Sequence, residues 1–398
     1  MPSNLAERLV QQTLINTLYA PNEVGGAERS VALLANSLAD AGHQVVVICT
    51  SPDKDKRVER GNVTIHYVKL RNVYWPYDEH HQYEKILWHL FDINNVLMTR
   101  RVKDILMAEN PNIVHTNNIA GFSIGVWQVA HKLRLPVVHT IRDYYLLCPR
   151  MTMFKDNNCS RQCAVCKVFS MPKLANTKLV DVVVGISRFI LSKHLEHGAF
   201  RSCDTAVIPN AYVPPTPVPR DEGGSVGRRL TLGYLGRFDR EKGVEFMLSE
   251  LCSLVDECWD LILAGKGFKA NIVPSAIRDR VRYVGYVNPQ EFFSQIDVLV
   301  VPSLWQEPLG RIVLEAHSHG VPVIGSKRGG IPEMIDDGVT GWLFEPEQPN
   351  SLASVVRAVI NDKALIREMA KNCRRRTVVY STDSVLGKYM EIYERVLK

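Results

Sequence analysis

Residues 11–49 read "QQTLINTLYAPNEVGGAERSVALLANSLADAGHQVVVIC". An apolar run comes first, and after a glycine turn the apolar residues Val31, Leu34 and Leu38 recur at helical spacing. A second apolar run, rich in β-branched residues, closes the stretch. Strand, turn, helix and strand in this order form the unit of a parallel, doubly wound sheet. The stretch therefore predicts an α/β fold.

The same alternation continues on both sides of a segment rich in proline and glycine. Residues 213–228, "VPPTPVPRDEGGSVGR", hold four prolines and three glycines and read as a linker. We expect a Rossmann-like domain over residues 1–212, a second over 229–378, and an amphipathic helix over 379–398. The 398 residues suffice for two domains of about 200 residues each. The other expected strands are "VTIHYV", "NIVHT", "PVVHT", "DVVVGIS", "TAVIPN", "LTLGYLG", "DLILAG", "VRYVGYV", "VLVVPS" and "VPVIGS".

The composition excludes some classes of function. Hydrophobic residues make up 46% of the chain, charged residues 23%, and the formal net charge is +6. This mildly basic balance favours anionic small ligands or an anionic membrane face. Nucleic acid binding is disfavoured, because the sequence has no basic stripe interleaved with aromatic residues. No apolar run reaches the roughly 18 to 20 residues of a membrane span, and the first residues lack a signal-peptide pattern. We therefore expect a cytoplasmic protein.

Charged residues follow two of the expected strands in the second domain. "LGYLGRFDREKG" places Arg237 and Lys242 after a strand, where two fixed cations suit a diphosphate; a solvated surface pair is the alternative. In "EPLGRIVLE", Glu307 and Glu315 flank an expected helix start, where acids are common without a function. Ligands of doubly wound sheets bind at the carboxyl ends of strands, so these loops are the first candidates for a site.

Three glycine-containing turns offer weaker signals. "EVGGAERS" places Gly25 and Gly26 between a strand and a helix, where backbone N–H groups and the helix dipole suit a phosphate. "LAGKG" offers Lys266 and Gly267 to a nucleotide, and Val287 in "GYV" offers its backbone to a base. The glycine pair lacks the full G-x-G-x-x-G pattern, so an NAD-dependent enzyme is disfavoured.

In their order, these motifs resemble the retaining glycosyltransferases of family four, which have the GT-B fold. The resemblance is densest in "GRFDREKGVEFML", "AGKG", "VRYVGYV" and the run from "VVPSLWQEPLGRIVLE" to "GVTGWLFEP", whose glutamates match the family's E-x7-E element. "NEVGGAERSVALLANSLADAGHQVVVIC", "PNIVHTNN" and "VIPNAYV" extend it to the first half. The resemblance implies two doubly wound, Rossmann-like domains facing across a cleft, with the last helix crossing back to the first domain.

The resemblance also implies roles for matching residues. Arg237 and Lys242 would neutralise the diphosphate of a nucleotide sugar as it leaves. Glu307 would hold hydroxyls of the donor sugar, and Glu315 would hold those of the ribose.

The turn between the two glutamates has an implied role of its own. After Pro308, the backbone N–H groups of Leu309 and Gly310 would point at a phosphate. Because fixed cations and N–H dipoles stabilise the leaving phosphate, no metal or cofactor is required for the chemistry. Retaining members react on one face without a protein nucleophile, so we expect a positioning role for Glu307.

One position departs from the family pattern. In relatives the strand matching "PVVHTIRDYY" ends in histidine followed by aspartate, whereas here Arg142 precedes Asp143. A guanidinium stays charged and cannot act as a general base, so we expect Arg142 to bind the donor sugar or an anionic acceptor. An ion pair with Asp143 or another acid is the alternative. Asn117 and Asn118, after "IVHT", are expected on the acceptor side.

Four of the nine cysteines gather within residues 148–166. Cys148, Cys159, Cys163 and Cys166 are separated by ten, three and two residues. Four thiolates suit a structural zinc ion or, as an alternative, an iron–sulfur cluster. Free buried cysteines are the other interpretation.

The acceptor is the least determined part of the prediction. The family resemblance implies a saccharide or lipid-linked saccharide, in bacterial-type surface polysaccharide or glycoconjugate assembly. In residues 72–91, Trp75, Tyr77 and Trp88 suit such an acceptor or the inner face of the cell membrane, unless "ILWHLF" is a buried helix face. A nucleotide-sugar epimerase of the same fold and a non-catalytic saccharide-binding relative remain as alternatives.

Overall fold

The computed structural model describes residues 10–22, 25–76, 81–214, 229–362 and 364–398. Most of the predicted linker, residues 215–228, lies outside the described residues, as does Tyr77. The chain forms two compact units. The first consists of Met1–Met153, Cys159–Tyr212 and Thr382–Lys398, and the second of Phe154–Asn158 and Val213–Ser381. No helix in the described residues is both long and apolar enough to cross a bilayer.

The first unit is built on one eight-stranded sheet in the order β3-β4-β2-β1-β5-β6-β7-β8. Each neighbouring pair is parallel except the β3–β4 pair at one edge. The strands are β1 (Gln11–Ile15), β2 (Gln44–Ser51), β3 (Lys56–Arg60), β4 (Val63–Lys69), β5 (Ile113–Thr116), β6 (Val137–Ile141), β7 (Val182–Gly185) and β8 (Asp204–Val207). The helices are α1 (Gly26–Asp40), α2 (Gln82–Phe91), α3 (Val96–Glu109), α4 (Gly125–Lys132), α5 (Ala164–Asn176), α6 (Arg188–Glu196) and α13 (Thr382–Val396).

The predicted strand–turn–helix–strand unit is confirmed as β1, α1 and β2. Strands β1, β2, β5, β6 and β7 are buried along almost their whole length, which explains their continuous apolar runs. Val31, Leu34 and Leu38 form the buried face of α1 and pack in the core against β1 and β2.

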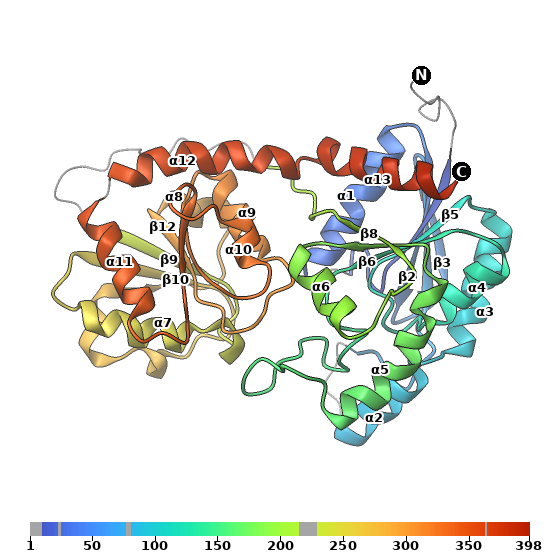
Figure 1. Ribbon diagram of the computed structural model, residues 1–398, viewed down its shortest axis with the longest axis horizontal. Coiled ribbons are helices and arrows are strands. Elements are labelled where there is room, and N and C mark those ends of the chain that lie inside the picture. The colour runs from blue at the N-terminus through green and yellow to red at the C-terminus, as the bar shows by residue number, and fades with distance from the viewer. Residues whose placement is uncertain (1–9, 23–24, 77–80, 215–228, 363) are drawn as a thin grey trace. The chain divides into compact units, whose positions relative to one another are not determined.

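The last helix, α13, packs in the core of the first unit beside α1 (Figure 1). Tyr393 Oη lies 2.7 Å from Nδ1 of buried His115, and Nε2 of the same ring lies 2.8 Å from Thr140 Oγ1. Tyr389 Oη lies 3.0 Å from Thr140 Oγ1. Burial holds the pKa of His115 well below its usual value, so the ring is a neutral hydrogen-bonding link. The predicted return of the last helix to the first domain is therefore confirmed.

The second unit contains a six-stranded parallel sheet in the order β11-β10-β9-β12-β13-β14. Its strands are β9 (Leu230–Leu235), β10 (Trp259–Ala264), β11 (Val281–Tyr283), β12 (Val298–Val301), β13 (Val323–Ser326) and β14 (Gly341–Phe344). Its helices are α7 (Val244–Leu251), α8 (Pro289–Ser294), α9 (Arg311–Ser318), α10 (Ile331–Met334), α11 (Ser351–Asn361) and α12 (Ala364–Arg376). Strand order reverses between β9 and β12, and ligands of doubly wound sheets bind at such a switch point.

We predict that Tyr393→Phe destabilises the first unit. The substitution leaves Nδ1 of buried His115 without its hydroxyl partner, which costs about 1 to 3 kcal/mol. Urea unfolding measures the change. Tyr286→Phe removes a hydroxyl from a side chain that is 77% exposed and is the control. Equal unfolding free energies for Tyr393→Phe and the unmodified chain would contradict the proposed anchor.

Candidate active site

Two loops meet at the carboxyl ends of β9 and β12. The first, after β9, contains Arg237 and ends in a short 3-10 turn, Arg240–Lys242. Gly243 follows with φ of +72°, and a Cβ there would lie 1.9 Å from the carbonyl oxygen of Pro302. Only glycine permits both this conformation and this approach. The close packing brings Lys242 to the loop after β12.

An ion pair connects the two loops. Lys242 Nζ lies 2.6 Å from Glu307 Oε1, and the two side chains are 21% and 16% exposed. The ammonium also lies 5.0 Å from the centroid of the Trp305 ring. Partial burial weakens solvent screening, so each charge depends strongly on the other.

The ion pair borders a pocket of about 280 Å³. The structure brings Arg237, Lys242 and Glu307 together here, as the sequence predicted for one ligand. The Arg237 guanidinium also lies 3.1 Å from Asp239 and 3.6 Å from Glu241. The described residues that line this pocket are Tyr234, Leu235, Gly236, Arg237, Lys242, Val300, Val301, Pro302, Ser303, Glu307, Arg311 and Ile312.

Helix α9 begins at Arg311, after Gly310 at φ of +89°. The left-handed backbone explains this glycine, and Leu309 before it is buried. Glu315 Oε1 accepts a hydrogen bond from Arg311 Nε at 3.0 Å. Arg311 lines the pocket, whereas Glu315 lies outside the described lining residues. The sequence did not predict a role for Arg311.

Two further turns were predicted to bind the nucleotide. Lys266 and Gly267 lie after β10, and Val287 lies after β11. Lys266 C=O accepts the Phe238 N–H at 3.1 Å, which ties its turn to the loop after β9. Lys266 Nζ lies 5.1 Å from the centroid of the Tyr286 ring. Gly267 and Val287, like Lys266, lie outside the described lining residues. Their predicted roles in nucleotide binding stay predictions.

In the first unit, Gly25 and Gly26 stand at the start of α1, as predicted. The Gly25 N–H donates to Glu28 Oε2 at 2.9 Å. An incoming phosphate would compete with this nearly buried carboxylate for that N–H group. Sequence reasoning missed Glu28, which lies three residues after the N-cap residue Gly25, in the position of a capping acid.

Polar side chains also gather at the carboxyl ends of β5 and β6. Arg142 donates from Nε to Asn117 Oδ1 at 2.9 Å and from Nη1 to Asn210 Oδ1. Asn118 Nδ2 donates to Asp143 Oδ2 at 2.9 Å. Burial is the main reason that the pKa of Asp143 rises to about 6. Arg142, Asn117 and Asn118 therefore lie together, around a cavity of only about 10 Å³.

The cysteine cluster predicted to bind a metal lies in the first unit except for the segment Phe154–Asn158. All four cysteines are free, and within the described ranges no three His, Cys, Asp or Glu side chains are arranged to hold a metal ion. Cys148 is buried, whereas Cys163 is exposed as the N-cap of α5 and accepts the Cys166 N–H at 3.5 Å. The pKa of Cys166 is raised mainly by burial and also by nearby Cys148 and Cys163, so the thiols of Cys148, Cys163 and Cys166 lie near one another. Zinc or iron–sulfur binding there stays a prediction.

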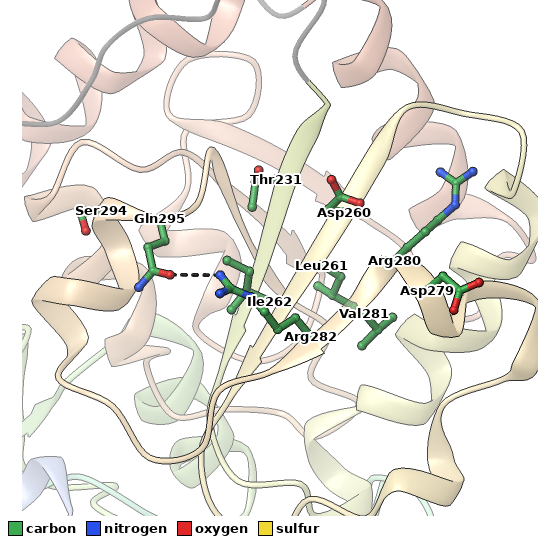
Figure 2. A pocket seen from close by; sticks show the side chains of 10 residues that line it. All are labelled: Thr231, Asp260, Leu261, Ile262, Asp279, Arg280, Val281, Arg282, Ser294 and Gln295. Atoms are coloured by element: carbon green, nitrogen blue, oxygen red, sulfur yellow. Dashed lines mark hydrogen bonds between the residues drawn. The ribbon is translucent and has the colours of Figure 1, made fainter.

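A larger pocket of about 580 Å³ lies at the opposite edge of the second sheet. Figure 2 shows it at the starts of β9 and β10, around Thr231 and Asp260. Arg282 donates to Gln295 at 3.1 Å, and Arg280 donates to backbone carbonyl oxygens, including that of Trp259. These cations have structural partners, and the pocket lies away from the switch point, so size alone does not make it the site.

Family models match both halves of the chain. The description "Glycosyltransferase Family 4" matches residues 24–213, and "Glycosyl transferases group 1" matches residues 229–362. An uncharacterized 42.6 kDa protein in the cps region of Klebsiella pneumoniae is 37% identical, over 81% of this chain and 86% of the relative. Glycogen synthase of Mycobacterium tuberculosis is 26% identical, over 91% and 89%.

Solved structures show the same fold. Sucrose-phosphate synthase from Thermosynechococcus elongatus aligns with a TM-score of 0.73 at 22% identity, covering 98% of this chain and 99% of that one. Anabaena HepE in complex with UDP and glucose aligns with a TM-score of 0.69 at 17% identity, covering 97% and 100%. The predicted GT-B fold is therefore confirmed.

We predict strong energetic coupling between Lys242 and Glu307. A double-mutant cycle with Lys242→Met and Glu307→Gln should give a coupling of about 1 to 3 kcal/mol in the free energy of unfolding, because the pair is partly buried. Arg229 and Asp260 form an exposed pair at 3.1 Å and serve as the control, with an expected coupling below about 1 kcal/mol. Similar coupling energies in the two cycles would refute the special environment of the Lys242 pair.

Proposed function

The chain belongs to the glycosyltransferases of family 4 and group 1, and we propose from this premise that it transfers a sugar from a nucleoside diphosphate sugar. The proposed acceptor is a saccharide or a lipid-linked saccharide. The observation that carries the proposal is the pocket where Lys242, Arg237 and Glu307 meet at the switch point of the second sheet.

The cations of the pocket fit the charge that develops in this reaction. When the bond between the sugar and the diphosphate breaks, negative charge grows on the leaving phosphate. Arg237 can bind two phosphate oxygens in a fork, and Lys242 supplies a compact positive charge. These two side chains supply charge stabilisation without a metal ion, so we propose metal-independent chemistry.

Glu307 fits a role in holding the donor sugar. Its carboxylate is a hydrogen-bond acceptor for sugar hydroxyls, and its partner Lys242 lies on the side where the phosphate would bind. The pair therefore suits a ligand whose hydroxyls and phosphate are adjacent. Because Lys242 engages the Glu307 carboxylate, we propose positioning rather than nucleophilic attack, with retention of configuration at the sugar.

The relatives favour polysaccharide assembly as the context. One relative is described by its place in a cps region, and glycogen synthase and sucrose-phosphate synthase are among the similar proteins. We propose that this chain acts in surface polysaccharide or glycoconjugate assembly on the cytoplasmic side of the cell membrane. UDP sugars are the first donors to test, because Anabaena HepE is described in complex with UDP and glucose.

We predict that one class of nucleotide sugar raises the melting temperature of the chain. A bound donor stabilises the folded state in proportion to the logarithm of its concentration over its dissociation constant. A thermal shift screen of nucleotide sugars measures this effect. Lys242→Ala should lose most of the shift, whereas Lys327→Ala, a lysine outside the pocket lining, should keep it.

Turnover distinguishes transfer from the alternatives. Release of free nucleoside diphosphate that depends on an added acceptor supports transfer. Conversion of the donor without an acceptor would indicate an epimerase. Absence of a thermal shift with every nucleotide sugar would contradict the proposed function.

A further inference from the structure

Helix α2 in the first unit exposes an apolar face. Tyr83, Ile86, Leu87, Leu90 and Phe91 are between 45% and 63% exposed, and their spacing places them on one side of the helix. Exposing five large apolar side chains to water costs free energy, and burial of this face against a binding partner would remove that cost.

Trp88, for which the sequence left open an acceptor contact, a membrane contact or a buried helix face, lies on the buried side of α2. Trp88 is buried, and its indole N–H donates to the Tyr74 carbonyl oxygen at 3.2 Å. The buried helix face is therefore confirmed for Trp88, because this ring belongs to the inner side of α2. The outward face of the same helix consists of other residues.

Helix α5 lies beside α2 (Figure 1) and exposes apolar side chains of its own. Val165, Val168 and Met171 recur every third residue and are 60% to 69% exposed. On their buried sides, the His89 ring of α2 and the Phe169 ring of α5 pack with centroids 5.9 Å apart.

A buried charged cluster fixes the two helices to each other. Asp92, directly after α2, accepts the Tyr145 hydroxyl at 2.6 Å and lies 3.9 Å from Lys173 Nζ of α5. The same ammonium lies 3.4 Å from the centroid of the Tyr145 ring. All three side chains are buried. The exposed face is therefore a fixed feature of the fold and not the result of a loose helix.

The two helices of this face carry more cations than acids. Helix α2 and residues 159–176, which include α5, contain one acid, Glu84. Asp92 is buried, and Glu84 accepts the His81 N–H at 2.9 Å at the start of α2. The exposed cations of these two segments are Lys85, Arg161 and Lys167. An anionic surface complements this charge.

We propose that α2 and α5 form a docking surface for an anionic lipid bilayer. Apolar side chains on two fixed helices would enter the boundary between headgroups and acyl chains, while flanking lysines and arginines contact anionic headgroups. This surface and the donor pocket have no residue in common. The surface bears on the proposed function in one way: it favours a lipid-linked acceptor.

Flotation of the full chain with vesicles tests the surface. The chain should bind vesicles that contain phosphatidylglycerol, and should bind less as salt rises or when the vesicles contain phosphatidylcholine alone. Ile86→Glu with Leu90→Glu should weaken binding at least about tenfold, because two inserted apolar side chains are replaced by charges. Val168→Glu with Met171→Glu should act in the same direction.

The control places a new acid elsewhere on the surface. Val378→Glu replaces an apolar side chain of the second unit that is 67% exposed, and should leave vesicle binding unchanged. Both double variants should keep the melting temperature and the donor-induced thermal shift, which separates loss of docking from failure of the donor proposal.

Two results would overturn the bilayer assignment. The first is absence of binding to anionic vesicles, or equal loss of binding in Val378→Glu. The second is a dimer of the unmodified chain in sedimentation that Ile86→Glu with Leu90→Glu turns into a monomer, since a second copy of the chain would then cover this face.

Discussion

Parallel pairing of β9 with β12 is the constraint on which the candidate site depends. The pairing puts the carboxyl ends of two strands side by side, although the loops that follow them are far apart in the chain. Lys242 and Glu307, 65 residues apart, can then form a short ion pair. Gly243 is the local requirement, because a side chain there would collide with the backbone after β12.

The first unit uses buried polar groups in a different way. His115, Thr140 and the tyrosines of α13 hold the end of the chain in a hydrogen-bonded core, and burial keeps the histidine neutral. Asp92 and Lys173 similarly fix α2 to α5. Buried polar groups therefore determine where helices lie, whereas the ion pair of the second unit lies at the wall of an open pocket.

The sequence predicted the fold where apolar patterns were strong. The buried strands appear where their runs predicted them, but β3, "KRVER", was missed because it is a charged, exposed edge strand that pairs through its backbone with β4. Strand β14, "GWLF", was missed because four residues between turns carry little periodicity. Helix α9 starts at Arg311, directly after Gly310, which adopts a left-handed conformation.

The site was predictable where residues follow strands directly, as Arg237 and Lys242 do. Arg311 could not be assigned to the pocket, because its position depends on the rotation of α9 about its axis. The sequence also could not predict which residues form the outward face of α2. "ILWHLF" contains apolar residues on every side, and only packing against α5 decides that Trp88 is buried while Leu90 is exposed.

The central claim is that one ligand places its diphosphate at Lys242 and its sugar at Glu307. Calorimetric titration of Glu307→Gln, with a stabilising nucleotide sugar and with the corresponding nucleoside diphosphate, tests this claim directly. The affinity of Glu307→Gln for the nucleotide sugar should fall about tenfold, while its affinity for the nucleoside diphosphate should be kept or increase. Equal weakening of both ligands would contradict it.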